Sequence, residues 1–524
     1  MEKPLVLIVG AGPSGLTLAI ELRRAGVEIR IIDKSAHPAL HSQALVVQAR
    51  TLELLQRYRL ADRAVAEGRP LRHGKFFSEG KEIASVDLSQ IPSRYPFSLF
   101  LAQTKTEEIL RDHLQSLGVR VERETELTGL TEEAELTAQL KHADGSVETL
   151  RPRWVVGCDG AHSQVRTLVG ISFEGGSVAL SFFLGDFELE GPDNPSDSLA
   201  LYLHRGDVVF LGRLTERLTR VIVAVHAEQA ADPNQILTIE DFQQPIDAAG
   251  VRLRVKSAEW MTPFHVNDRQ AQQYRKGDVF LVGDASHIHS PLGGQGMNTG
   301  IQDAVNLGWK LAAVASGADE SLLDSYQEER SEVGKALLRF TERGLKLTTA
   351  SNSLVERLRD TLLPHLADLT PVQHTMLGFI SETAIEYRSS SIVYDYGGDG
   401  TLHAGDRMAE VKVGEEDADE TLLKDWTETG HLALVIHASS ELGAELAADL
   451  PTIPFIVLQS SDLNDEGLAL LGREPKLLMI RPDGYIGFRG PLTQRDEWLL
   501  YARQVGIASP YFDPGAAVPG FLRV

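Results

Sequence analysis

The chain has a single cysteine, Cys158, among its 524 residues. One thiol excludes an intrachain disulfide and a cysteine-based zinc site, and such low cysteine use suits a reducing cytoplasm. Long apolar runs are also missing, since no stretch approaches the roughly 20 residues that a membrane-spanning helix needs. The apolar run near the start is too short for a signal peptide and passes directly into a glycine loop. We therefore expect a cytoplasmic protein with no membrane partner.

Positive charge is scarce as well. The sequence has 51 Lys and Arg against 74 Asp and Glu, which gives a formal net charge of −23. This balance argues against nucleic acid as a partner, but it does not restrict a small ligand, because the charge of a pocket is local. The length and a hydrophobic content of 43% are enough for two or three domains. A monomer and a homodimer are both left open.

A glycine loop lies between the first two predicted strands. The apolar run LVLIV precedes GAGPSG, a helical pattern follows, and a second strand ends at Asp33. In this dinucleotide-binding pattern Gly10 makes the turn, Gly12 lets the backbone approach a pyrophosphate, and Gly15 lets the helix pack on the strand. Asp33 is placed to accept hydrogen bonds from ribose hydroxyls.

A second glycine loop follows a short apolar strand and reads GDASHIHSPLGGQGMN. Asp284 at the strand tip can accept hydrogen bonds from ligand hydroxyls. The apolar spacing after the loop predicts a helix, whose N-terminus would attract negative charge. His287 and His289 look like a metal pair, but no further ligands stand near them, so we expect no metal.

A third motif, CDGAHSQVR, follows another short strand. Together the three ordered motifs resemble the class A FAD-dependent aromatic monooxygenases, over roughly residues 1–345. The resemblance implies tightly but non-covalently bound FAD, with NADPH as a transient reductant that has no Rossmann domain of its own, and O2. It also implies that a flavin C4a-hydroperoxide hydroxylates a small aromatic substrate, phenolic or polyketide-like.

The resemblance also assigns cofactor contacts. Gln103 would reach the ribityl chain, and Leu127 would meet the adenine through its backbone. Asp159 would serve both FAD and NADPH, and it could also cap the helical segment that follows it. The N–H groups that open the second predicted helix would stabilise negative charge on reduced flavin. The full expected set is Gly10, Gly12, Pro13, Ser14, Gly15, Asp33, Lys34, Gln43, Gln103, Leu127, Asp159, Asp284, Gly294, Gly296, Met297 and Asn298.

The sequence assigns no catalytic acid, base or nucleophile. By resemblance, the carbonyl of Pro291 and the side chain of Arg220 are candidates at the flavin edge. No GxSxG or Ser-His-Asp order offers a covalent alternative. Candidates for the substrate pocket, each also readable as a core or surface residue, are Tyr202, Phe210, Arg213 and His226.

The predicted fold class is α/β. We expect a Rossmann-type (GR2-like) FAD-binding domain, an inserted β-rich substrate domain, a helical linker and a C-terminal α/β domain that resembles thioredoxin. Because that last domain has no cysteine, a thiol redox role is excluded, and a structural role or a dimerisation surface remains. The expected ranges are 1–75, 100–180 and 275–345 for FAD, 76–99 and 181–274 for substrate, 346–399 for the linker and 400–524 for the tail.

Other functions stay open. A Baeyer–Villiger or drug-inactivating monooxygenase of the same fold is the nearest alternative, and a non-catalytic flavoprotein scaffold is another. A halogenase of this fold is disfavoured, because its WxWxIP signature is absent.

One position departs from the family. The family commonly has Ser-Arg-Ala where this chain has Ser-Gln-Ala around Gln43. A charge-assisted hydrogen bond contributes about 1.5–3 kcal/mol against about 1 kcal/mol for a neutral one. We therefore expect weaker phosphate binding at Gln43, offset by nearby Lys34 or Arg50.

Overall fold

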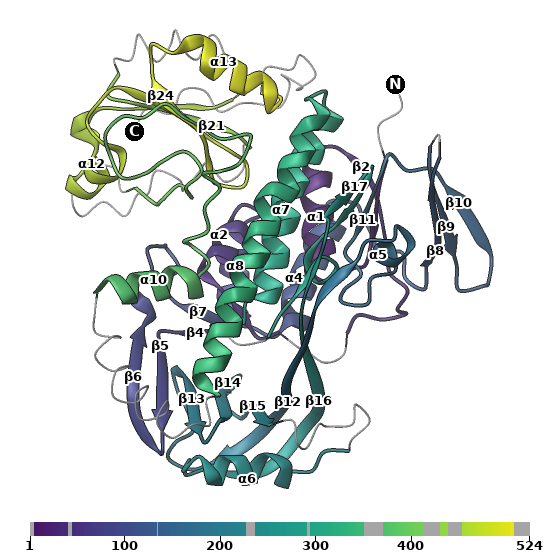
Figure 1. Cartoon of the computed structure of the whole chain (residues 1–524), viewed down its shortest axis with the longest axis vertical. Helices are drawn as coiled ribbons and strands as arrows, with labels where there is room; N and C mark the ends of the chain where they lie inside the picture. The colour runs from purple at the N-terminus through teal and green to yellow at the C-terminus, as the bar shows by residue number, and fades with distance from the viewer. Residues whose placement is uncertain are drawn as a thin grey trace.

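The computed structural model describes residues 5–39, 44–133, 135–226, 236–290, 294–349, 370–411, 430–438 and 453–507. A body around a parallel sheet, a broad second sheet below it and a smaller C-terminal part above it make up the chain (Figure 1). Strands β12 (Phe173–Glu190) and β16 (Arg254–Ala271) pair with each other and run from the body into the second sheet. The predicted α/β class is confirmed.

The body is organised by a five-stranded sheet of order β17-β18-β11-β1-β2. Its inner strand β1 is LVLIV and is almost wholly buried, as is typical of parallel strands covered on both faces. Strand β1 is parallel to β2 and β11, and β11 is parallel to β18. The strands are β1 (Leu5–Val9), β2 (Glu28–Ile32), β11 (Trp154–Gly157), β17 (Arg275–Lys276) and β18 (Val279–Leu281).

Helix α7 (Gly296–Ala315) crosses the body and is buried over most of its length. It packs beside α1 (Pro13–Arg24) through small residues. A Cβ added at Gly300 of α7 would lie 2.5 Å from Ser14 Oγ of α1, and a Cβ added at Gly283, in the turn after β18, would lie 2.6 Å from the same atom. Both glycine loops are thereby brought together. None of the helices in the described ranges is both long and apolar enough to cross a membrane. The body also has α2 (Ala49–Gln56), α3 (Ala61–Glu67), α4 (Gln103–Ser116), α5 (Gln164–Leu168), α8 (Asp324–Thr348) and the 3-10 turns η1 (Leu88–Gln90), η3 (Gly283–Ala285) and η4 (Glu320–Leu323).

Two small three-stranded sheets complete the body. Their orders are β10-β9-β8 and β3-β7-β4, and all of their pairings are antiparallel. The strands are β3 (Val46–Val47), β4 (Arg69–Leu71), β7 (Ser98–Phe100), β8 (Glu126–Glu132), β9 (Leu136–Lys141) and β10 (Val147–Leu150).

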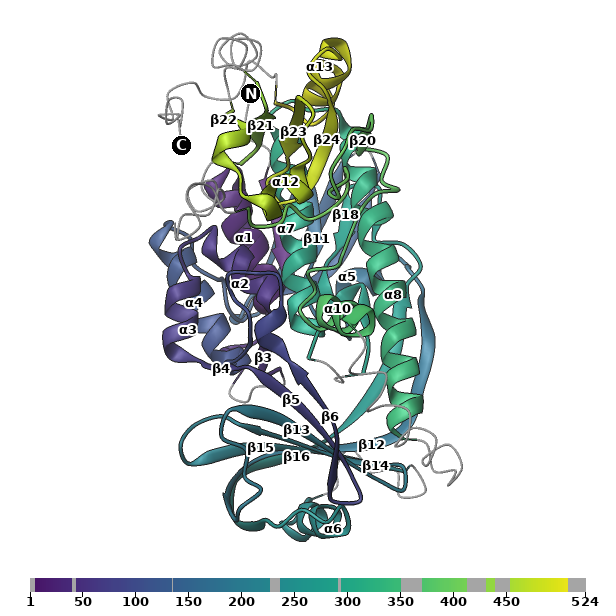
Figure 2. The same cartoon turned by 90° about the vertical axis from the view of Figure 1, so that its left-hand side faces the viewer.

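The second sheet has the order β19-β16-β12-β15-β14-β13-β5-β6. Helix α6 (Glu240–Ala248) covers the face that is turned away from the body (Figure 2), through an apolar cluster that includes Phe187 and Phe242. On the other face, Phe210 packs in a cluster with Phe100 of the body. The remaining strands are β5 (His73–Ser78), β6 (Lys81–Asp87), β13 (Ser198–His204), β14 (Asp207–Arg213), β15 (Leu218–His226) and β19 (His287–Ile288).

The C-terminal part is a mixed sheet of order β20-β24-β23-β21-β22. Strand β21 is parallel to β22 and antiparallel to β23, which is antiparallel to β24. The likeness of this part to thioredoxin stays a prediction. Its elements are β20 (Tyr394–Asp395), β21 (Leu432–Ile436), β22 (Phe455–Leu458), η6 (Ser460–Asp462), α12 (Asp465–Leu471), β23 (Lys476–Ile480), β24 (Ile486–Pro491) and α13 (Arg495–Gln504), and α10 (Thr370–Ile380) precedes them.

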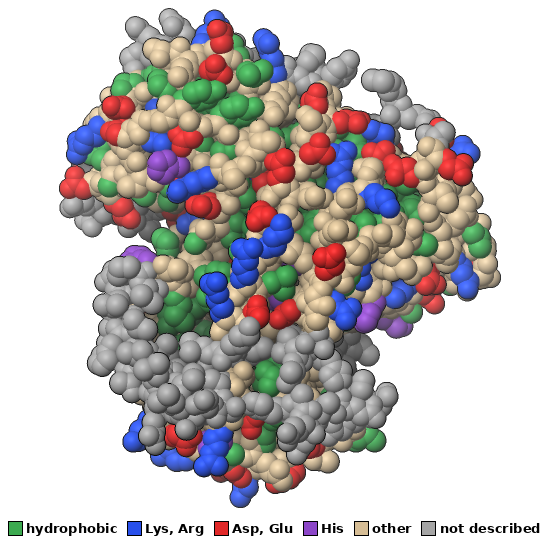
Figure 3. Space-filling view, viewed as in Figure 1, with side chains coloured by type: hydrophobic (Ala, Val, Ile, Leu, Met, Phe, Trp, Pro, Cys, Tyr) green, Lys and Arg blue, Asp and Glu red, His purple; other side chains and the backbone are tan. Residues whose placement is uncertain are grey.

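Charged side chains are mixed on the surface. In the view of Figure 3, acidic and basic groups alternate over the upper part of the molecule rather than gathering by sign. The acidic side chains behind the net charge of −23 therefore do not gather into one continuous patch in this view.

Gly15→Ala is expected to destabilise the body, because the added Cβ would lie 2.0 Å from the carbonyl oxygen of Gly10. Overpacking of this kind costs about 1–3 kcal/mol, so the thermal unfolding midpoint should fall. Gly12→Ala is the control, since no atom lies within 4 Å of its ideal Cβ. Equal midpoints for the two variants would contradict this account.

Candidate cofactor and active site

The first glycine loop exposes bare backbone at the start of α1. Gly10 has φ +103°, and a Cβ there would lie 2.3 Å from the carbonyl oxygen of Cys158. Gly12 is the N-cap of α1, no side chain caps the helix, and the space around its Cβ position is open. An uncapped helix N-terminus with open space before it fits a pyrophosphate.

Asp33 leaves β2 and folds back over this loop. Its Oδ2 accepts a hydrogen bond from the Ala11 N–H at 2.9 Å, and its Oδ1 accepts one from the Ser35 N–H at 2.8 Å. Arg123 Nη1 lies 3.5 Å from Oδ2. The carboxylate is thus held at the edge of the loop, where the sequence predicts a ribose contact, and Lys34 beside it is exposed.

Asp284 lies in the turn η3 directly after β18. Its side chain is exposed, yet desolvation by the surrounding protein raises its pKa. This position suits an acceptor for the hydroxyls of a bound ligand.

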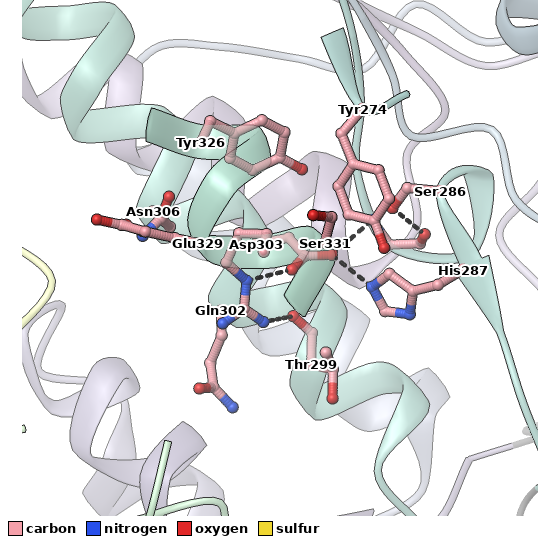
Figure 4. A network of polar contacts seen from close by, with 12 residues as sticks. Tyr274, Ser286, His287, Thr299, Gln302, Asp303, Asn306, Tyr326, Glu329 and Ser331 are labelled. Carbon is pink, nitrogen blue, oxygen red and sulfur yellow. Dashed lines mark hydrogen bonds and ion pairs between the residues drawn. The ribbon is translucent and has the colours of Figure 1, made fainter. Parts of the chain in front are cut away.

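Asp303 of α7 holds that turn in place. Its Oδ2 accepts a hydrogen bond from the Gly283 N–H at 3.1 Å and lies 2.8 Å from His287 Nε2 (Figure 4), and its Oδ1 accepts one from Arg330 Nε at 2.5 Å. Desolvation opposes ionisation, but Arg330 and His287 outweigh it and lower the pKa of Asp303 to about 2. One buried anion therefore joins the loop, α7 and α8.

The start of α7 is also left without a side-chain cap. In its first turn, Asn298 Oδ1 accepts a hydrogen bond from the Gln48 N–H at 2.9 Å, and its Nδ2 donates to the carbonyls of Val46 and Gly294 at 2.8 and 2.7 Å. The Asn298 side chain thus ties β3 to α7. The sequence predicted only a backbone role for this residue.

Comparison with known proteins agrees with this geometry. Residues 3–341 match the family model described as FAD binding domain. The chain is 35% identical over 513 residues to 6-methylpretetramide 4-monooxygenase of Streptomyces rimosus, covering 93% of this chain and 91% of the relative. It is 34% identical over 425 residues to pentachlorophenol 4-monooxygenase of Sphingobium chlorophenolicum, covering 80% and 76%. The solved anhydrotetracycline hydroxylase OxyS from Streptomyces rimosus superposes with a TM-score of 0.78 at 32% identity, covering 96% and 99%. The chain belongs to the FAD-dependent aromatic monooxygenases.

Three residues that the resemblance assigns to the cofactor have the following positions. Gln103 opens α4, and its Oε1 accepts a hydrogen bond from the Ala44 N–H at 3.2 Å. Leu127 is buried on β8. Asp159 accepts a hydrogen bond from the Gln164 N–H at 2.7 Å at the start of α5, the capping role that the sequence allowed beside a cofactor role.

The substrate candidates are not all brought together. Phe210 faces the body, with its ring centroid 6.5 Å from that of Phe100. Tyr202 stacks on Phe77 at 4.5 Å within the cluster beneath α6, on the opposite face of the sheet. Arg213 donates to two carbonyls of its own turn, at 3.2 and 2.6 Å. Strand alternation explains the split, because neighbouring residues point to opposite faces.

Three expectations lie outside the described residues. Pro291 and Gln43 are not described, and neither is the side chain of His226 at the end of β15. Their roles stay predictions.

Arg220 faces the body but already has an anionic partner. It is 1% exposed and pairs in two places with Asp186, Nε to Oδ1 at 2.7 Å and Nη2 to Oδ2 at 2.8 Å. Trp260 Nε1 donates to the same Oδ2 at 2.7 Å. These three residues lie opposite one another on adjacent strands, in one row that continues to Gly212. The ring of Phe100 fills the space that a side chain at Gly212 would occupy. Asp186 was not found from the sequence, because no local motif marks it.

Arg50, which is expected to offset the neutral Gln43, has partners on α2 and in the C-terminal part. It is buried on α2, with Nη1 2.8 Å from Glu53 Oε2, and its Nη2 donates to the Asp483 carbonyl at 2.5 Å. The offset of Gln43 by Lys34 or Arg50 stays a prediction.

Asp303→Asn is expected to cost about 3–5 kcal/mol at neutral pH, because it leaves Arg330 buried without its anion. In the folded protein the pKa of Asp303 is about 2, below its ordinary value of 3.8. The ionised form therefore contributes stability above pH 4 that is lost as the pH falls toward 2. The difference in unfolding free energy between wild type and variant should shrink by about 2 kcal/mol over that range. A constant difference in chemical denaturation would contradict this prediction.

Proposed function

We propose that this monooxygenase uses NADPH and O2 to hydroxylate a small aromatic substrate, phenolic or polyketide-like. The observation that carries the proposal is the meeting of α1 and α7 at uncapped N-termini, with Asp33 after β2 and Asp284 after β18 of the same parallel sheet. Relatives named for 6-methylpretetramide, anhydrotetracycline and pentachlorophenol support the choice of substrate class.

The residues present fit FAD. The pyrophosphate would lie on Gly12 at the start of α1, the ribose on Asp33, the ribityl chain on Asp284, and the pyrimidine end of the flavin at the first turn of α7. When bound and reduced, FAD supplies the activation of O2. The protein binds and orients the cofactor and substrate and excludes water from between them.

The start of α7 favours negative charge. A helix N-terminus acts as roughly half a positive charge, and this one is uncapped by side chains. Asp303 lies farther along the same helix, but Arg330 matches its charge at 2.5 Å. The field at the helix start is therefore preserved for an anionic reduced cofactor.

The body-facing side of the second sheet suits an aromatic substrate. Phe182 and Phe264 lie on it with ring centroids 5.2 Å apart, in one cluster with Ile222, which is opposite Phe210 on the neighbouring strand. Aromatic and aliphatic walls of this kind bind planar apolar ligands, and a few polar groups orient them.

The purified protein is expected to hold FAD non-covalently, and Gly12→Leu should abolish binding, because the side chain would occupy the place of the pyrophosphate. Gly344→Leu is a matched control, since its Cβ position is equally open but lies on α8. Flavin absorbance that remains with the protein after gel filtration measures retention. Wild-type protein that stays colourless after refolding with excess FAD would refute the proposed function.

Flavin reduction by NADPH is expected to be roughly tenfold or more faster once an accepted aromatic substrate is bound, since reduction without substrate would waste NADPH as peroxide. Stopped-flow reduction with a panel of phenols and polycyclic aromatics tests this. The accepted compound should also gain one oxygen atom, as mass spectrometry would show. Equal reduction rates with and without that compound would argue against substrate gating.

A further inference from the structure

A buried acid from beyond the family match at residues 3–341 lies against the start of α7. Glu382 follows α10 and is 3% exposed. Its Oε1 accepts a hydrogen bond from Thr299 Oγ1 at 2.9 Å, and its Oε2 accepts one from Gln302 Nε2. Thr299 and Gln302 belong to the first two turns of α7, which begins at Gly296.

The backbone around Glu382 fixes this position. Gln295 Nε2 donates to the Phe379 carbonyl at 2.9 Å, and the Arg50 N–H donates to the Ser381 carbonyl at 3.2 Å. One short segment thus holds the starts of α7 and α2 together. The carboxyl of Glu382 is consequently placed by the fold and not by a flexible side chain alone.

The surroundings of Glu382 favour its neutral form. Both of its hydrogen-bond donors are uncharged, and the charged groups that face it are Arg330 of α8 and Asp303 of α7, which pair with each other. Desolvation raises the pKa of Glu382 to about 8, and Asp303 adds to this, while Thr299, Arg330 and Gln302 oppose it. The acid therefore carries its proton at neutral pH.

We propose that Glu382 is a positioning residue that sets the electrostatic potential at the start of α7 and couples the uptake of one proton to the reduction of FAD. The inference rests on the proposed placement of the flavin at that helix start. Protonated Glu382 leaves the positive helix end free to stabilise reduced FAD, whereas ionised Glu382 adds a negative charge within the first two turns.

The coupling has a defined sign. Below about pH 8 the acid is neutral in both redox states, so no extra proton is taken up. Above that pH it is ionised beside oxidised FAD, and the negative charge that reduction creates raises its proton affinity. The hydride of NADPH supplies both electrons, and the additional proton comes from water and bonds to a carboxylate oxygen of Glu382.

The test is the midpoint potential of bound FAD against pH, measured with reference dyes on wild type and Glu382→Gln. The wild-type potential should fall about twofold more steeply with pH above about pH 8 than below it, because two protons in place of one accompany two electrons. Glu382→Gln is neutral at every pH and keeps an acceptor oxygen for Thr299, so its slope should stay constant.

Glu410→Gln is the matched control. Burial raises the pKa of Glu410 to about 7, and Glu53 adds to this, while Arg94 and Arg407 oppose it. None of these three residues belongs to α7, so the Glu410→Gln variant should keep the wild-type profile. A wild-type profile with no steeper segment, or a Glu382→Gln profile that retains it, would overturn the proposal.

If the Glu382→Gln variant does not bind FAD, a second measurement tests the proposal on wild type alone. With NADPH as the reductant, indicator dye then counts the protons that the wild type takes up from solution at about pH 9. Hydride transfer alone gives the anionic reduced flavin without a proton from water, so one proton per FAD supports the proposal and none refutes it. Wild type that binds no FAD would refute the proposed function instead, so the two failures are distinguishable.

Discussion

The carboxylate of Asp303 is the contact on which the cofactor site depends. It lies within hydrogen-bond distance of the Gly283 N–H, His287 Nε2 and Arg330 Nε, so the second glycine loop, α7 and α8 share one buried anion. Removing any one partner would leave an ion or a polar group buried and unmatched, at a cost of several kcal/mol. The turn that carries Asp284 is therefore held in place by the two helices behind it.

A second buried cluster joins the same helices to the C-terminal part. Arg481 pairs with both oxygens of Glu329 at 2.6 and 2.8 Å, and Asp483 accepts a hydrogen bond from Trp309 Nε1 at 3.1 Å. Glu329 contacts the C-terminal hairpin, while its neighbour Arg330 contacts Asp303. Two consecutive residues of α8 thus connect the C-terminal part to the turn that carries Asp284.

The sequence predicts what is local. Both glycine loops, Asp33 and Asp284 were found because the strand, loop and helix that form each motif are adjacent in the chain. Glu382 and Arg330 were missed because their partners on α7 lie dozens of residues away and no spacing marks them. Tyr202 and Phe210 were grouped together because alternation along a strand does not reveal which face α6 covers. The polar residues inside α7 look like ordinary helix positions until their buried partners are known.

Ionised acids near a site that is proposed to stabilise one negative charge would repel that charge. The chain reduces this repulsion in three ways. Asp303 and Asp186 are buried and matched by Arg330 and Arg220. Glu382 is buried without a cation in direct contact, and it keeps its proton instead. Asp284 stays exposed at the end of β18, where desolvation by the surrounding protein raises its pKa and so disfavours its charge. For Asp303 and Glu382, the two acids that contact α7 or its first turns, the positive helix end is left uncancelled, as the proposed binding of a reduced, anionic cofactor requires.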